Sequence, residues 1–131
     1  MILPVRELRN KDYRRSLEKI QGSNPDSQTE VNVAQALDIL GYEYVFQYWL
    51  GGASMRGSKE IDFLILTVPK PTPLLVHGEY WHTGLMAVED ELKEAEINSQ
   101  MRGLWNKVEI IWDYEAETVE EAQSRLQQIL W

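Results

Sequence analysis

Residues 60–68, with the sequence EIDFLILTV, decide the fold class of this 131-residue chain. The β-branched and apolar residues run almost without interruption, which is typical of a strand buried on both faces. The acidic start of this stretch places a carboxylate, Asp62, inside the apolar run. A buried charge without a partner costs several kcal/mol. We therefore expect a buried strand whose aspartate pairs with another group or binds a metal ion.

Further elements are predicted on both sides of this strand. Turn residues and aromatic or apolar runs indicate three more strands, at residues 42–50, 74–77 and 108–112. Helical periodicity and helix start signals predict helices at residues 28–40, 87–101 and 118–130. Capping boxes at residues 27–30 and 118–121 open the first and third of these helices, and Gly41 ends the first. The order α-β-β-β-α-β-α predicts a single α/β domain with a mixed β-sheet flanked by helices.

The segment between the predicted second and third strands is rich in proline. Residues 69–73 read PKPTP. Proline lacks the backbone N–H that a ladder needs, so we expect this segment to be neither helix nor central strand.

Composition limits the classes of protein that the chain can represent. It has 131 residues, of which 44% are hydrophobic, enough for one domain with a core of its own. Cysteine is absent, which excludes disulfides, thiolate zinc sites and cysteine nucleophiles. There is no apolar run of membrane-spanning length, and the first ten residues, MILPVRELRN, do not resemble a signal peptide. We therefore expect a cytoplasmic, intracellular protein with no membrane partner.

Charge is distributed unevenly along the chain. Residues 1–26 carry six basic and four acidic residues, whereas residues 27–131 carry seven basic and seventeen acidic residues. We expect residues 1–26 to form a basic N-terminal arm or short helix and residues 27–131 to form the α/β domain. The net charge of −8 by itself disfavours a nucleic-acid partner. An excess of carboxylates in the domain is also compatible with a cation site.

Five side chains are candidates for chemistry: Glu30, Asp62, His77, Glu79 and His82. Carboxylate oxygens with neighbouring imidazoles suit a divalent cation and acid–base chemistry on phosphate. Without cysteine, Mg²⁺ or Mn²⁺ is favoured and no zinc is expected. Structural roles stay open for most of them. Glu30 completes a capping box, Glu79 is explained equally well as a solvated loop carboxylate, and both histidines as ordinary loop residues.

The combination of Glu30, residues 61–65 (IDFLI) and residues 74–82 (LLVHGEYWH) resembles the PD-(D/E)XK nuclease superfamily. Within it, the chain is most similar to the very-short-patch mismatch-repair (Vsr-like) endonuclease branch. The resemblance covers residues 27–115 and includes a downstream strand that ends in IWD at residues 111–113. It implies a restriction-endonuclease-like core and a Mg²⁺-dependent endodeoxyribonuclease that hydrolyses backbone phosphodiesters of DNA.

The resemblance also implies a role for each matched residue in the catalytic site. Asp62 would be the principal metal ligand and the backbone carbonyl of Val76 the second. His77 and His82 would lie by the scissile phosphate, one positioning water and the other stabilising charge. Glu30 would hold metal-bound waters or orient a histidine.

Other positions would contact DNA or depart from the family pattern. Tyr80 and Trp81 match an aromatic pair that wedges into the base stack. Arg56 and Lys59 lie in a glycine-rich loop where they would contact phosphate or remain solvated. Glu79 stands where the branch has another residue and would be an extra metal ligand. The superfamily's usual lysine on the third strand is absent, as it is in the Vsr-like branch, and a chain without cysteine cannot build the structural zinc site of the mismatch enzymes.

Several substrates and one inactive alternative stay open. The resemblance is compatible with a nuclease specific for branched or mismatched DNA in repair, recombination or phage DNA processing. A Holliday-junction resolvase would act as a homodimer, because it cuts two strands symmetrically. Loss of the lysine is also compatible with a catalytically inactive DNA-binding module on the same fold.

Overall fold

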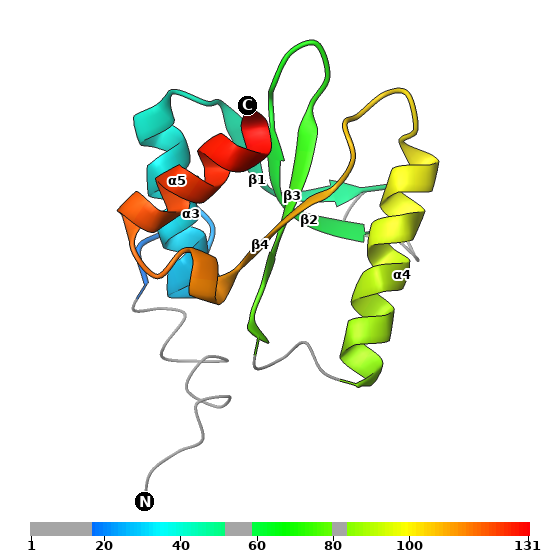
Figure 1. Ribbon diagram of the computed structural model, residues 1–131, viewed down its shortest axis with the longest axis horizontal. Coiled ribbons are helices and arrows are strands. Elements are labelled where there is room, and N and C mark those ends of the chain that lie inside the picture. The colour runs from blue at the N-terminus through cyan, green and yellow to red at the C-terminus, as the bar shows by residue number, and fades with distance from the viewer. Residues whose placement is uncertain (1–16, 52–58, 80–83) are drawn as a thin grey trace, which may run out of the picture.

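The computed structural model describes residues 17–51, 59–79 and 84–131, and these form a four-stranded mixed sheet flanked by helices (Figure 1). The strands are β1 (Tyr44–Leu50), β2 (Lys59–Ile65), β3 (Thr72–His77) and β4 (Glu109–Trp112). They lie in the order β1-β2-β3-β4, with β1, β2 and β3 antiparallel and β4 parallel to β3. The helices are α3 (Gln28–Leu40), α4 (Leu85–Gln100) and α5 (Val119–Leu130), and the short 3-10 helix η3 (Asp113–Glu115) follows β4. The predicted mixed α/β architecture is confirmed.

Helices α3 and α5 begin at the predicted capping boxes, whereas α4 begins at Leu85, two residues before its predicted start. At the start of α3, Ser27 Oγ accepts a hydrogen bond from the Glu30 N–H at 3.3 Å. The Glu30 carboxylate accepts one from the Asp26 N–H at 3.0 Å, one residue before the cap. The same arrangement recurs at α5, where Thr118 Oγ1 accepts from the Glu121 N–H at 3.1 Å. Each cap satisfies backbone donors that the first helical turn would otherwise leave without partners.

Two hydrophobic clusters hold the helices against the sheet. In Figure 1, α3 and α5 lie together on one side of the molecule, and α4 lies apart from them. The larger cluster joins α3 and α5 to sheet residues that include Phe46, Phe63 and Leu74. The smaller cluster contains Leu50, Ile61, Leu75, Ile97 and Val108, of which Ile97 belongs to α4. Ile97 is the fully buried residue of α4, so this helix is anchored mainly at one point.

The β1–β2 pair changes the layer against which it packs at Gln47 and Asp62. Phe63 belongs to the cluster of α3 and α5, whereas Ile61, two residues away on the same strand, belongs to the cluster of α4. Residues two apart on a regular strand share a face. The register of β1 with β2 places Gln47 opposite Asp62, and Gln47 has a left-handed backbone with φ 54°. Asp62 therefore lies between the two parts of β2 that pack against different layers.

One expectation about the strands is wrong. Thr72 and Pro73, expected outside the sheet, belong to β3, a central strand, and Pro73 pairs with Leu64 of β2. Pairing of β3 with β4 starts only at Leu74. At Pro73, β3 is paired with β2 but not yet with β4. Proline is tolerated there because no backbone hydrogen bond to β4 is lost when its N–H is missing. Strand β2 also ends at Ile65, before the end predicted at residue 68.

The described part of the predicted N-terminal arm packs on the domain. Residues 1–16 lie outside the described residues, and residues 17–20 are not helical. Ile20 is buried in the cluster of α3 and α5, and the Gln21 side chain accepts a hydrogen bond from the Phe46 N–H at 2.9 Å. Within the described ranges, no helix is both long and apolar enough to cross a bilayer.

Candidate active site

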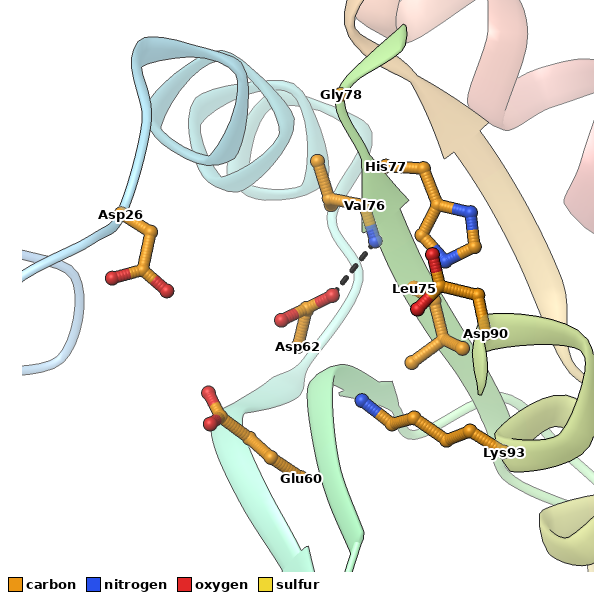
Figure 2. Close-up of a pocket in the computed structure, with 9 residues that line it drawn as sticks. All are labelled: Asp26, Glu60, Asp62, Leu75, Val76, His77, Gly78, Asp90 and Lys93. Atoms are coloured by element: carbon orange, nitrogen blue, oxygen red, sulfur yellow. Dashed lines mark hydrogen bonds between the residues drawn. The ribbon is translucent and has the colours of Figure 1, made fainter. Parts of the chain in front are cut away.

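Asp62 lies where strands β2 and β3 diverge. The pairing of these strands extends from Ile65 and Thr72 only as far as Phe63 and Leu74. Beyond that point the Val76 N–H donates a hydrogen bond of 2.8 Å to Asp62 Oδ2, in place of a backbone carbonyl (Figure 2). The aspartate therefore completes the hydrogen bonding of the sheet at the fork, and its second oxygen is left for another partner.

A pocket of about 310 Å³ opens at this fork. It is lined by residues from the loop before α3, from β2, from the end of β3 and from α4, namely Asp26, Glu60, Asp62, Leu75, Val76, His77, Gly78, Asp90 and Lys93. Four of these residues are carboxylates and one is a lysine, so the pocket carries net negative charge when the acids are ionised. A pocket of this charge attracts cations.

Burial makes the ionised form of Asp62 unfavourable. Burial raises the pKa of Asp62 to about 7, although the Val76 hydrogen bond and the positive charge of Lys93 act in the opposite direction. The residue retains partial access to solvent through the pocket, while its carboxyl group is surrounded by protein atoms. A bound cation would reverse this effect, because it stabilises the carboxylate directly.

Glu30 is close enough to Asp62 for the negative charge of Asp62 to affect its pKa. Burial, and then the negative charges of Asp62 and Asp26, raise the pKa of Glu30 to about 8. Its Oε2 accepts the two hydrogen bonds of the helix cap, from Asp26 N and Ser27 Oγ, but Oε1 is buried and accepts none within the described part of the chain. The capping role predicted for Glu30 is confirmed. The cap does not explain the buried Oε1, which leaves a second role open.

His77 lies at the end of β3 and borders the same pocket. Its ring packs edge-on against Trp112, with centroids 5.2 Å apart, so the imidazole is held in one orientation. Asp90 of α4 lines the same pocket (Figure 2). An imidazole can both accept and donate a proton near neutral pH. The geometry thus gives the pocket a group suited to proton transfer.

The donor set of the pocket fits a magnesium ion held by few protein ligands. Within residues 17–51, 59–79 and 84–131, no group of three or more acidic or histidine side chains is arranged to hold a metal ion. Mg²⁺ usually keeps several waters and needs only one or two carboxylates. The carbonyl of a strand residue points to the same side as its own N–H. The Val76 carbonyl is therefore on the side of Asp62, as the two-ligand prediction requires.

The structure does not bring Glu79 to this pocket. Glu79 borders a different pocket, together with Gln28, Asn32 and Tyr114. Its N–H donates to Asp113 Oδ1 at 3.2 Å, which ties the end of β3 to the end of β4. Its predicted role as an additional metal ligand has no support from this placement.

The remaining predicted residues are distributed as follows. Lys59 begins β2, and its ammonium group forms a 3.0 Å salt bridge with Glu96 of α4. Its charge is therefore already compensated in part. The predicted site residues Arg56, Tyr80, Trp81 and His82 lie outside the described residues.

Four residues of the pocket were missed by reasoning from the sequence: Asp26, Glu60, Asp90 and Lys93. Asp26 and Glu60 lie close in sequence to residues that were identified. Asp90 and Lys93 lie in a strongly charged helix, where charges are usually solvated. Their separation of three residues places them on one helix face together with buried Ile97, and this spacing was the available signal.

Comparisons with known proteins identify no relative of this chain: no protein-family model, no curated protein and no solved structure matches it.

Proposed function

We propose that this protein is a metal-dependent endodeoxyribonuclease, which hydrolyses backbone phosphodiesters of DNA. The observation that carries the proposal is the buried carboxylate of Asp62 at the fork of β2 and β3. One of its oxygens is held by the Val76 N–H, and the Val76 carbonyl lies on the same side. Mg²⁺ or Mn²⁺ bound there would neutralise charge that develops on phosphate oxygens during hydrolysis.

The neighbouring residues support phosphate chemistry at the fork. Asp62 and Val76 would hold the cation, and the acidic pocket would retain it. His77 is fixed against Trp112 and is suited to take or give a proton at the edge of the pocket. The negative pocket would repel a nucleic-acid phosphate without a cation, so the proposal requires metal dependence.

The architecture supports the proposal at the level of fold class. The observed order of elements and the mixed four-stranded sheet are compatible with the restriction-endonuclease-like core that the sequence motifs imply. A fold hosts many functions, so this agreement is weaker support than the site.

A cleavage assay tests the proposal. Labelled duplex, T·G mismatch, four-way junction, flap and single-stranded DNA are incubated with Mg²⁺, Mn²⁺ or EDTA. We expect cleavage that requires the metal and that Asp62→Asn abolishes. Asparagine keeps an acceptor for the Val76 N–H, so the sheet is retained. The matched control is Glu43→Gln, an exposed carboxyl outside the pocket, which should cleave like wild type.

The outcomes separate the alternatives that the sequence leaves open. The preferred DNA distinguishes a junction resolvase from a mismatch nickase or a general nuclease. DNA binding without cleavage under any metal condition would favour the inactive binding module. Cleavage that Asp62→Asn leaves intact would contradict the site.

A further inference from the structure

Helix α4 directs a lysine into the pocket that contains Asp62. Lys93 lies one turn before Ile97, which is buried against Ile61 and Leu75. Ile61 directly precedes Asp62 in β2, and Leu75 directly precedes Val76 in β3. The packing of Ile97 therefore places the same face of α4 over the fork, and Figure 2 shows Lys93 extending from α4 toward Asp62 and Glu60.

A salt bridge also joins the adjoining turn of α4 to β2. Glu96 of α4 binds Lys59 at the start of β2, with 3.0 Å between charged atoms. Lys59 therefore has a carboxylate partner in Glu96, and its surroundings differ from those of Lys93. Within the described ranges, no carboxylate lies within salt-bridge distance of Lys93 Nζ, although four carboxylates line the same pocket.

We propose that Lys93 binds a non-bridging oxygen of the phosphodiester that is cut at Asp62. The inference rests on the proposed nuclease function and gives α4 a residue that contacts the substrate. Lys93 borders the pocket together with Asp62, and no described carboxylate forms a salt bridge with its ammonium group. An anionic phosphate entering between the Asp62 site and α4 would complete its coordination by hydrogen bonds.

A simpler role for Lys93 is to balance the charge of the acidic pocket. A lysine that only balances charge would affect folding stability and the protonation of its neighbours. Its effect on the cleavage rate would not depend on whether the scissile phosphate is charged. The two roles are therefore separated by changing the phosphate and the lysine together.

The experiment combines three variants with two substrates. Lys93→Met, Lys93→Arg and the control Lys107→Met, which alters an exposed lysine outside the pocket, are compared with wild type. Each protein is assayed at saturating Mg²⁺ on the preferred DNA of the cleavage panel. A second substrate carries an uncharged methylphosphonate in place of the scissile phosphate. Thermal unfolding verifies that each variant is folded.

We expect Lys93→Met to lower kcat by about 10² to 10³, the usual effect of removing one donor to a developing oxyanion. Lys93→Arg should recover most of this loss, and Lys107→Met should cut like wild type. On the methylphosphonate substrate, wild type and Lys93→Met should differ by less than about tenfold, because the charge that Lys93 binds is missing.

Three results would overturn the assignment, and they are distinguishable. If wild type cuts and Lys93→Met cuts equally well, Lys93 has no role in the reaction, but the proposed nuclease function stands. If Lys93→Met is impaired to the same extent on both substrates, the lysine acts through the pocket and not on the phosphate. If wild type cuts no DNA with either metal, the proposed function fails, and this assignment fails with it.

Discussion

Replacing Glu30 with glutamine should alter the pH dependence of folding stability. In the wild-type protein, burial and the charges of Asp62 and Asp26 raise the pKa of Glu30 from 4.5 to about 8. Between these two pH values the folded protein retains a proton that the unfolded chain has released. The free energy of unfolding therefore falls as the pH rises through this window, and the loss is complete only above the pKa of the folded state.

The magnitude follows from the width of the window. Each pKa unit corresponds to about 1.4 kcal/mol, so the Glu30 shift is worth roughly 3 to 5 kcal/mol by pH 8. Glu30→Gln keeps an acceptor for the Asp26 N–H and the Ser27 hydroxyl but cannot ionise. We expect the variant to be more stable than wild type at pH 8 by a few kcal/mol and to be close to wild type at pH 5.

The assay is urea denaturation in EDTA at several pH values between 5 and 8. Glu43→Gln, an exposed carboxyl, serves as the matched control and should reproduce the wild-type slope. Mg²⁺ should flatten the slope of wild type, because a cation at Asp62 offsets the charge that destabilises both carboxylates. Equal pH slopes for wild type and Glu30→Gln in EDTA would refute the electrostatic coupling derived from the structure.

Two further predictions concern the site and the strand that shapes it. His77→Ala should lower the single-turnover cleavage rate by about 10² to 10⁴ while DNA affinity is retained, and an unchanged rate would remove His77 from the reaction. Gln47→Gly should raise the free energy of unfolding in urea by about 1 kcal/mol, because glycine adopts the left-handed backbone at φ 54° without strain. Destabilisation by this change would mean that the Gln47 side chain contributes more than its conformation costs.

Much of the fold was predictable because local signals agree with the tertiary structure. Helix α3 spans the predicted residues 28–40. Its N-terminal cap at Ser27 and its end at Gly41 depend only on neighbouring residues, so the sequence alone indicates both. The apolar run of β2 was predicted as a buried strand, and it is one. Pro73 was misplaced because its tolerance in β3 depends on where pairing with β4 begins, which is not a local property.

A residue of the candidate site was predictable only where a charged side chain stands among apolar neighbours in the sequence. Asp62 was identified because a carboxylate within an apolar run needs a partner, and the structure provides the Val76 N–H. Asp90 and Lys93 were missed because charges in an exposed-looking helix are unremarkable in sequence. Glu79 was grouped with His77 because the two are close in the chain, but they border different pockets.

The sequence by itself determined the order of the elements, the ends of the capped helices and the presence of a carboxylate in a buried strand. These follow from backbone propensity, capping and hydrophobic periodicity, which act over a few residues. Only the tertiary structure decided that β1 and β2 change layers at Gln47 and Asp62, and that α4 places Lys93 over the fork. The reason is that both features depend on how Ile61, Leu75 and Ile97 pack together, and these residues are brought into contact only when the chain folds.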